Sequence, residues 1–173
     1  TVKQIPFGNR TGPQRILFGF ARGVRLELGA GDHVQKRFGL YEIEIWSALE
    51  KAVRLAEVIF DVGAFEGFYT LAFARRPRCR TVVSIEGNPD IFPLLEKNLS
   101  LNPGLKDKVR PLCRMIGPGN PLDGVAGELG DPQLVKMDVE GAEMDILRTA
   151  EGLVGRAHPV WVIETHSAAL EKE

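Results

Sequence analysis

The sequence has little cysteine and no excess of charge of either sign. Its two cysteines, Cys79 and Cys113, lack the paired spacing of a zinc site or a redox motif, and strand-like neighbours favour two buried free thiols. The 22 basic and 23 acidic side chains give a formal net charge of -1, whereas a nucleic-acid-binding protein usually has a basic excess. We therefore expect a reduced, cytoplasmic protein whose charge argues against a nucleic-acid partner.

Long apolar runs are absent too, and so is the dinucleotide-binding glycine motif. No run approaches the length of a membrane-spanning helix, and residues 1–10 carry no apolar signal-peptide core, so we expect no membrane partner. The glycines after the first long apolar run, Gly63 and Gly67, are spaced Gly-x-x-x-Gly rather than Gly-x-Gly-x-x-Gly. This spacing argues against NAD.

What remains is the composition of an ordinary globular domain. Hydrophobic residues make up 44% of the 173 residues and charged residues 26%, enough for one compact core. No repeat or linker divides the chain. We expect a single domain over 1–173, with an N-terminal hairpin extension at 1–40 and a ligand-binding core at 41–173.

The order of apolar segments predicts the fold. Strand-like residues at 15–18 and 24–28 flank a turn and predict a short hairpin, and an amphipathic stripe predicts a helix over 42–57. Strands and helices then alternate. The expected strands are 57–62, 81–86, 109–115, 133–138 and 160–164, and the expected helices are 68–75, 89–101 and 142–150. The glycine- and proline-rich stretch 117–132 is expected to be a surface loop.

Strands that alternate with helices predict a fold of the α/β class. We expect a doubly wound, Rossmann-like sheet, mostly parallel, with helices on both faces. Ligands of such sheets bind at the carboxyl ends of the strands. Four expected strands end on or beside an acidic residue, which predicts a polar site at that edge; these residues are Asp61, Glu86, Asp138 and Glu164.

Two strand ends suggest a ligand that contains adenosine. The turn 61–70 places Gly63 and Gly67 before a helix, where free amides can hold a pyrophosphate or a carboxylate, although turn chemistry alone also explains the glycines. Glu86 ends the next strand, where a carboxylate can accept hydrogen bonds from ribose hydroxyls. Asn88, two residues later, also suits a helix N-cap.

The segment 136–143, Lys-Met-Asp-Val-Glu-Gly-Ala-Glu, forms the third strand-to-helix turn. It places the carboxylates of Asp138 and Glu140 beside the expected site. Either residue could instead cap the helix that follows, and the segment alone leaves both interpretations open.

These segments, taken together, resemble the FkbM family of S-adenosylmethionine-dependent methyltransferases. The resemblance rests on 136–143 above all, and it extends over roughly residues 23 to 166. The other matching segments are Gly39-Leu40-Tyr41-Glu42, Asp61-Val62-Gly63-Ala64, Gly67-Phe68-Tyr69-Thr70, Glu86-Gly87-Asn88-Pro89, Asn98, Asn102 and Glu164-Thr165-His166.

The resemblance implies a methyltransferase fold with S-adenosylmethionine as cofactor. Gly63, Ala64 and Gly67 would then line the methionine portion, with Asp61 near its amino group. Glu86 would bind the ribose, and Asn88 would flank the adenine. Family members usually add an antiparallel strand pair after the fifth strand, and this sequence stops soon after Glu164, which leaves the presence of that pair open. Residues 116–118 offer no acidic residue for the adenine amino group.

Methyl transfer to a hydroxyl needs alignment and benefits from a base. The candidate catalytic residues are Asp138, Glu140 and His166, in falling order. The same three side chains are types that can bind a divalent metal, but their spacing is not diagnostic, and no metal is predicted.

The leading functional hypothesis is O-methylation of a small molecule such as a sugar, lipid or secondary metabolite. The alternatives are an RNA-modifying methyltransferase and a non-catalytic domain that binds the cofactor or acts as a scaffold. An exposed sheet edge would also permit a homodimer.

Overall fold

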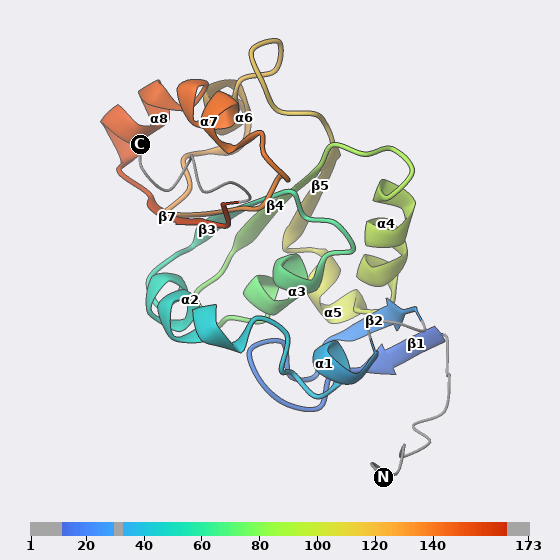
Figure 1. The fold of residues 1–173 in the computed structure, drawn as a ribbon. Coiled ribbons are helices and arrows are strands. Elements are labelled where there is room, and N and C mark those ends of the chain that lie inside the picture. Colours follow the sequence, from blue (N-terminus) through green and yellow to red (C-terminus); the bar gives the residue numbers. More distant parts are fainter. Residues whose placement is uncertain (1–11, 30–32, 166–173) are drawn as a thin grey trace, which may run out of the picture.

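The computed structural model describes residues 12–29 and 33–165. Its centre is a parallel sheet of five strands in the order β5-β4-β3-β6-β7 (Figure 1). The strands are β3 (Val58–Val62), β4 (Thr81–Glu86), β5 (Val109–Cys113), β6 (Leu134–Met137) and β7 (Val160–Ile163). The order reverses between β4 and β6, on either side of β3, so the expected doubly wound sheet is confirmed.

Helices cover both faces of this sheet, as Figure 1 shows. One face packs against α2 (Trp46–Val53), α3 (Phe68–Ala74) and α4 (Phe92–Ser100). The other face packs against α6 (Leu122–Leu129), α7 (Glu143–Arg148) and α8 (Glu151–Ala157). Strand side chains alternate between the two cores: Ile59 points to the first and Phe60 to the second.

The N-terminal hairpin is confirmed, but its first strand lies earlier than predicted. β1 (Gly12–Arg15) pairs antiparallel with β2 (Arg25–Leu28). The predicted residues 16–18 lie largely in the connection because Ile16 is the last residue that bonds across, to Val24 and Gly23. A short helix that we did not predict, α1 (His33–Arg37), follows the hairpin.

Two further predictions about elements are wrong, and two helices were missed. The expected helix over 42–57 is the single turn η1 (Ile43–Ile45) followed by the shorter α2. The expected loop 117–132 contains α6, and α5 (Pro103–Lys106) and α8 were not predicted. Cys79 is buried as expected, whereas Cys113 ends the edge strand β5 and is exposed.

In the described ranges the main sheet ends at β7, and no antiparallel strand is paired with it. Within the same ranges, every helix is too short or too polar to cross a lipid bilayer.

Candidate cofactor and acceptor site

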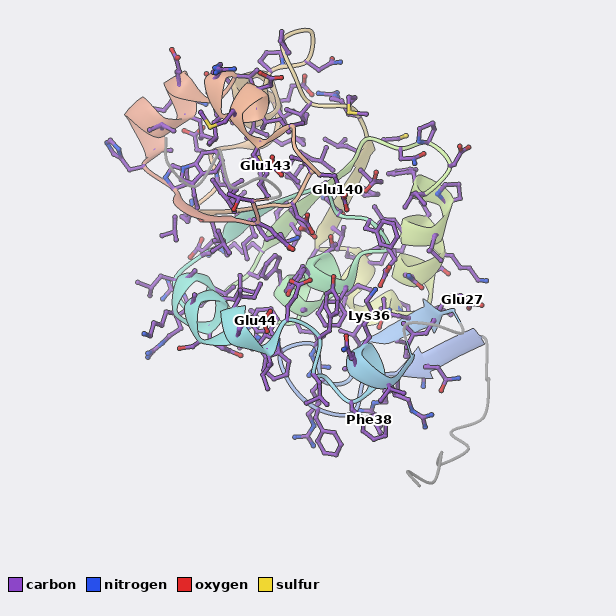
Figure 2. All side chains as sticks on the ribbon, in the orientation of Figure 1. Glu27, Lys36, Phe38, Glu44, Glu140 and Glu143 are labelled. Carbon is purple, nitrogen blue, oxygen red and sulfur yellow. The ribbon has the colours of Figure 1, made fainter. Side chains whose placement is uncertain are left out.

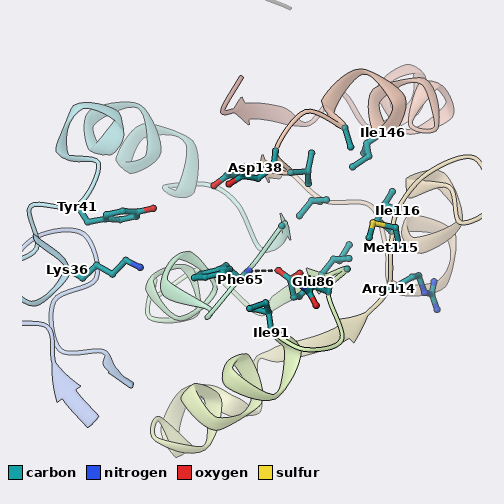
Figure 3. A pocket seen from close by; sticks show the side chains of 18 residues that line it. Lys36, Tyr41, Phe65, Glu86, Ile91, Arg114, Met115, Ile116, Asp138 and Ile146 are labelled. Carbon is teal, nitrogen blue, oxygen red and sulfur yellow. Dashed lines mark hydrogen bonds between the residues drawn. The ribbon is translucent and has the colours of Figure 1, made fainter. Parts of the chain in front are cut away.

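A cavity of about 640 Å³ lies at the carboxyl ends of β3, β4 and β6. This is the edge at which ligands of doubly wound sheets bind, and the volume lies in the range of ~300–1,000 Å³ that is usual for ligand pockets. Figure 3 shows its length: Lys36 and Tyr41 lie at one end, Glu86 and Asp138 in the middle, and Arg114 and Met115 at the other.

Glu86 is fixed in the middle of the cavity by backbone amides. Phe65 N donates to its Oε2 and Asn88 N to its Oε1, both at 2.7 Å. Only 8% of the residue is exposed. A carboxylate has about four lone-pair sites, so each oxygen can accept one further hydrogen bond from a ligand.

The two glycines of the turn after β3 are required by the protein's own packing. A Cβ on Gly63 would lie 1.7 Å from the Asp138 carbonyl oxygen, and one on Gly67 would lie 2.6 Å from Leu95 Cδ1. Both residues also have positive φ, 77° and 86°, which favours glycine. Gly63 lines the cavity, whereas Gly67 lies outside its wall, at the start of α3.

Four amides of the turn after β3 are already used within the protein. Gly63 N and Ala64 N both donate to the Ile85 carbonyl at 2.9 Å, and Gly67 N donates to the Ala64 carbonyl at 2.8 Å. Phe65 N is used by Glu86. Three of these amides hold the turn against β4 and the fourth closes the turn itself, so none of the four is free for a ligand carboxylate.

A row of polar side chains crosses the sheet next to the cavity. Asp61 is opposite Ser84 on β4 and Lys136 on β6, and all three are buried. Thr70 of α3 covers the row: its hydroxyl donates to Asp61 Oδ2 at 2.5 Å and lies 2.7 Å from Ser84 Oγ. Asp61 Oδ1 has no hydrogen-bond partner in the described ranges.

Burial strongly affects the acid–base chemistry of this row. Desolvation raises the pKa of the Asp61 carboxyl above its ordinary value, although the nearby Lys136 ammonium and the Thr70 hydroxyl oppose the change. Asp61 lies on a small cavity of about 40 Å³, whose wall shares Lys36, Gly63 and Asp138 with the larger one.

The motif 136–143 brings several charged groups to the same edge. Lys136 Nζ pairs with Asp138 Oδ2 at 3.1 Å and lies 4.8 Å from the centre of the Tyr69 ring. Asp138 and Glu140 both line the large cavity, and Glu140 is exposed. Figure 2 labels Glu140 and Glu143 in the segment after β6. Glu143 is buried instead, where its Oε1 accepts a hydrogen bond from Gly141 N at 3.0 Å.

Two expected caps take a different form in the structure. The N-cap of α7 is Ala142, so neither Asp138 nor Glu140 occupies that position. Asn88 accepts a hydrogen bond from Asp90 N at 2.9 Å in the turn before α4, but the N-cap of α4 is Ile91. Asn88 also lines the cavity beside Glu86.

The predicted site residues are therefore largely brought together. Those that line the large cavity are Gly63, Glu86, Asn88, Asp138 and Glu140, and those on the small one include Asp61 and Ala64. His166 lies outside the described residues. The described residues contain no cluster of three or more histidine, cysteine or acidic side chains that could hold a metal ion.

Other residues of the cavity escaped the sequence analysis. Lys36 had no local signal, because it is a lone lysine in the segment that we assigned to a hairpin extension. Tyr41 belongs to a segment that we used only for the family resemblance. The far end is walled mainly by apolar side chains where an acidic residue was sought; they include Ile91, Met115, Ile116 and Ile146.

Comparison with known proteins finds two methyltransferase domains along the chain. Residues 32–115 match the TRM5/TYW2 methyltransferase domain, and residues 118–173, which include the 136–143 motif, match the methyltransferase FkbM domain. The chain is similar to methyltransferase domains over most of its length, and to the FkbM domain over its last third. The resemblance inferred from sequence is thus confirmed. No curated protein matches the chain.

Solved structures agree on the fold. An FkbM methyltransferase from Methylobacillus flagellatus superposes with a TM-score of 0.55 at 20% identity, over 62% of this domain and 32% of that protein. Precorrin-8w decarboxylase from Methanobacterium thermoautotrophicum gives 0.58 at 22% identity, over 75% and 66%. An SAH-bound methyltransferase from Podospora anserina gives 0.54 at 18% identity, over 69% and 50%. The chain thus spans between about a third and two thirds of the length of these proteins.

Proposed function

We propose that the chain binds S-adenosylmethionine in the sheet-edge cavity and methylates an oxygen atom of a small molecule such as a sugar, lipid or secondary metabolite. The observation that supports this most directly is Glu86, a buried carboxylate at the end of β4 that faces a cavity of ligand size. In this position it accepts hydrogen bonds from the two ribose hydroxyls.

The other residues of the cavity fit the remaining parts of the cofactor. Asp61 has a buried oxygen without a hydrogen-bond partner in the described ranges, and an α-ammonium group would supply the missing donor. Asn88 and the apolar end near Ile116 suit the adenine ring. Gly63 and Ala64 keep the turn below the methionine portion compact. When bound, S-adenosylmethionine supplies a methyl group already activated on a sulfonium.

The chain's own contribution to transfer is alignment and proton removal. Asp138 lines the middle of the cavity, and Lys136 at 3.1 Å holds its carboxylate in place. We assign Asp138 as the base that takes the acceptor's hydroxyl proton, with Glu140 at the rim as the second candidate. His166 remains a third candidate on sequence grounds alone.

The first test of this function is a calorimetric titration of the chain with S-adenosylhomocysteine, with NAD as the control ligand. We expect binding of S-adenosylhomocysteine and none of NAD. Absence of binding to both would contradict the proposed function and favour a scaffold domain.

The role of Asp138 is tested once acceptor screening has given a substrate. Asp138→Asn should bind S-adenosylhomocysteine like the parent and lower the transfer rate by roughly 10²–10⁴-fold, the usual contribution of a general base. Asp145→Asn, on the exposed side of α7, is the matched control. An undiminished rate in Asp138→Asn would transfer the role to Glu140.

A further inference from the structure

A buried lysine at one end of the cavity has hydrogen-bonding capacity that the protein does not use. Lys36, on α1, is only 6% exposed, and its ammonium group forms an ion pair with the equally buried Glu66. In the described part of the chain, Glu66 is its only hydrogen-bond acceptor. An ammonium group has three donors, so two remain.

The surroundings of Lys36 direct those donors toward the ligand space. The ammonium lies 4.9 Å from the centre of the Tyr41 ring and 5.9 Å from that of Phe65, and all three residues line the large cavity. Aromatic faces favour a cation without accepting a strong hydrogen bond from it. The Lys36 ammonium is therefore a buried positive charge with one carboxylate partner and open cavity beside it. Such a group can bind an anionic group of a ligand.

The position of Lys36 along the cavity identifies that group. Figure 3 shows Lys36 and Tyr41 at the end opposite Met115 and Arg114, with Glu86 between them. A nucleoside held by its ribose at Glu86, with its base among the apolar side chains near Ile116, extends its 5′ substituent toward Lys36. For the proposed cofactor this substituent ends in an amino acid, whose carboxylate finds no free amide at Gly63 or Ala64.

We infer that Lys36 binds the α-carboxylate of the cofactor's methionine portion and thereby fixes the direction in which the cofactor lies. This inference rests on the proposed function and adds a binding residue from the N-terminal segment. Glu66 keeps the ammonium in place, and Asp61, on the adjoining small cavity, faces the α-ammonium of the same amino acid. The two charges of the methionine portion thus meet two opposite charges of the protein.

The test compares two ligands that differ only in this carboxylate, S-adenosylmethionine and decarboxylated S-adenosylmethionine. The parent chain should prefer S-adenosylmethionine by about ten- to hundredfold in Kd, the range for a hydrogen-bonded charge pair. Lys36→Met should lose this preference and still bind the decarboxylated ligand like the parent. Because the single variant leaves Glu66 buried and unpaired, the double variant Lys36→Met/Glu66→Gln removes both charges and should behave in the same way.

Lys51→Met, an exposed position on α2, is the matched control and should keep the preference. A preference that persists in both Lys36 variants would overturn the inference. So would equal weakening of both ligands, which indicates that Lys36 only supports the wall. A parent chain that binds both ligands equally would overturn the inference alone, whereas one that binds neither would overturn the proposed function with it.

Discussion

Both oxygens of the Glu86 carboxylate accept a backbone amide, and the same carboxylate faces the ligand cavity. The amides of Phe65 and Asn88 belong to the turns after β3 and β4, so Glu86 connects the two turns that border the cavity. Its orientation is therefore set before any ligand arrives, which lowers the entropic cost of binding.

Replacement of Glu86 should affect both ligand affinity and the free energy of unfolding. We expect Glu86→Ala to weaken S-adenosylhomocysteine binding by about tenfold or more, because two ribose hydroxyls lose a charged acceptor. The two orphaned amides should also lower the free energy of unfolding, by about 1–3 kcal/mol. Calorimetry and urea denaturation measure the two effects. Glu96→Ala, exposed on α4, should change neither, and parent-like affinity in Glu86→Ala would remove the residue from the site.

The buried Asp61 carboxyl gives a prediction about pH. Since desolvation raises its pKa in the folded chain, the folded state binds this proton more tightly than the unfolded state. The protonated Asp61 carboxyl therefore stabilises the folded state at low pH. This stabilisation is lost as the pH rises from the ordinary carboxyl pKa, around 4, through the higher pKa of the folded state. Asp61→Asn removes this titration.

Urea denaturation at a series of pH values from about 4 to 8 measures the difference. The free energy of unfolding of the parent should fall more steeply with rising pH than that of Asp61→Asn. Asp145→Asn, at an exposed position, should follow the parent. Parallel curves for Asp61→Asn and the parent would show that Lys136 and Thr70 fully compensate for the burial.

Among the individual site residues, those that directly follow strands could be predicted from the sequence. Glu86 and Asp138 stand directly at strand ends, and parallel strands bring such positions to one edge. Lys36 could not be predicted in this way because it comes from a helix of five residues and reaches the cavity through tertiary packing. The packing requirement for Gly63 could not be predicted for the same reason: the nearby Asp138 carbonyl, which requires the glycine, follows another strand.

Among the secondary-structure elements, α6 shows how a correct fold can contain a wrong local prediction. Its glycines and the preceding Pro121 indicated a loop, yet Leu122, Val125 and Ala126 face the sheet and are buried. Apolar spacing of three and four residues is a helical signal, and here it outweighed the glycines because tertiary burial adds more than helix propensity removes. The strands of the parallel sheet, in contrast, are short and mostly apolar, and their positions were predicted within two residues at either end.

α6 also caps its neighbour. The Asp123 carboxylate accepts hydrogen bonds from Gly152 N at 2.8 Å and Leu153 N at 2.5 Å, which are amides in the first turn of α8. These amides have no partner within their own helix, so Asp123 replaces the missing N-cap side chain of Ala150.

We expect Asp123→Ala to lower the free energy of unfolding by about 1–2 kcal/mol, as for the loss of a helix cap. Urea denaturation measures this loss, and hydrogen exchange should show faster exchange of the first α8 amides. Asp107→Ala, an exposed carboxylate after α5, controls for charge removal. Unchanged exchange in α8 would mean that water serves these amides equally well.

Over the whole molecule, α4 connects the N-terminal hairpin to the turn that holds Glu66. Asn98 on α4 accepts from Glu27 N at 2.7 Å and donates to the Glu66 carbonyl at 2.8 Å. Asn102, one turn later, accepts from Arg25 N at 2.9 Å and donates to the Arg25 carbonyl at 2.7 Å. The two asparagines thus satisfy the outer edge of β2, which would otherwise be an exposed strand edge.

These bonds give a structural role in this chain to the two asparagines that form part of the family resemblance. They also connect the hairpin and α1 to the turn that holds Glu66, the partner of Lys36. The predicted division at residue 40 separates the expected hairpin extension from the elements that follow it. Side-chain bonds from α4 to β2 leave no periodic signal, so a sequence pattern could not reveal this connection.

Asn98→Ala therefore tests whether the hairpin and the cavity act together. Asn98 is fully buried, so its loss leaves an amide and a carbonyl without partners, and we expect the free energy of unfolding to fall by roughly 2–4 kcal/mol. Exchange of the β2 amides should become faster, and S-adenosylhomocysteine should bind more weakly because Lys36 is no longer held in position. Asn120→Ala, in an exposed turn, should alter none of these quantities. The opposite result would be an unchanged affinity for S-adenosylhomocysteine together with faster exchange of the β2 amides. The hairpin would then not contribute to binding, and the binding site would have to be assigned to the sheet edge alone.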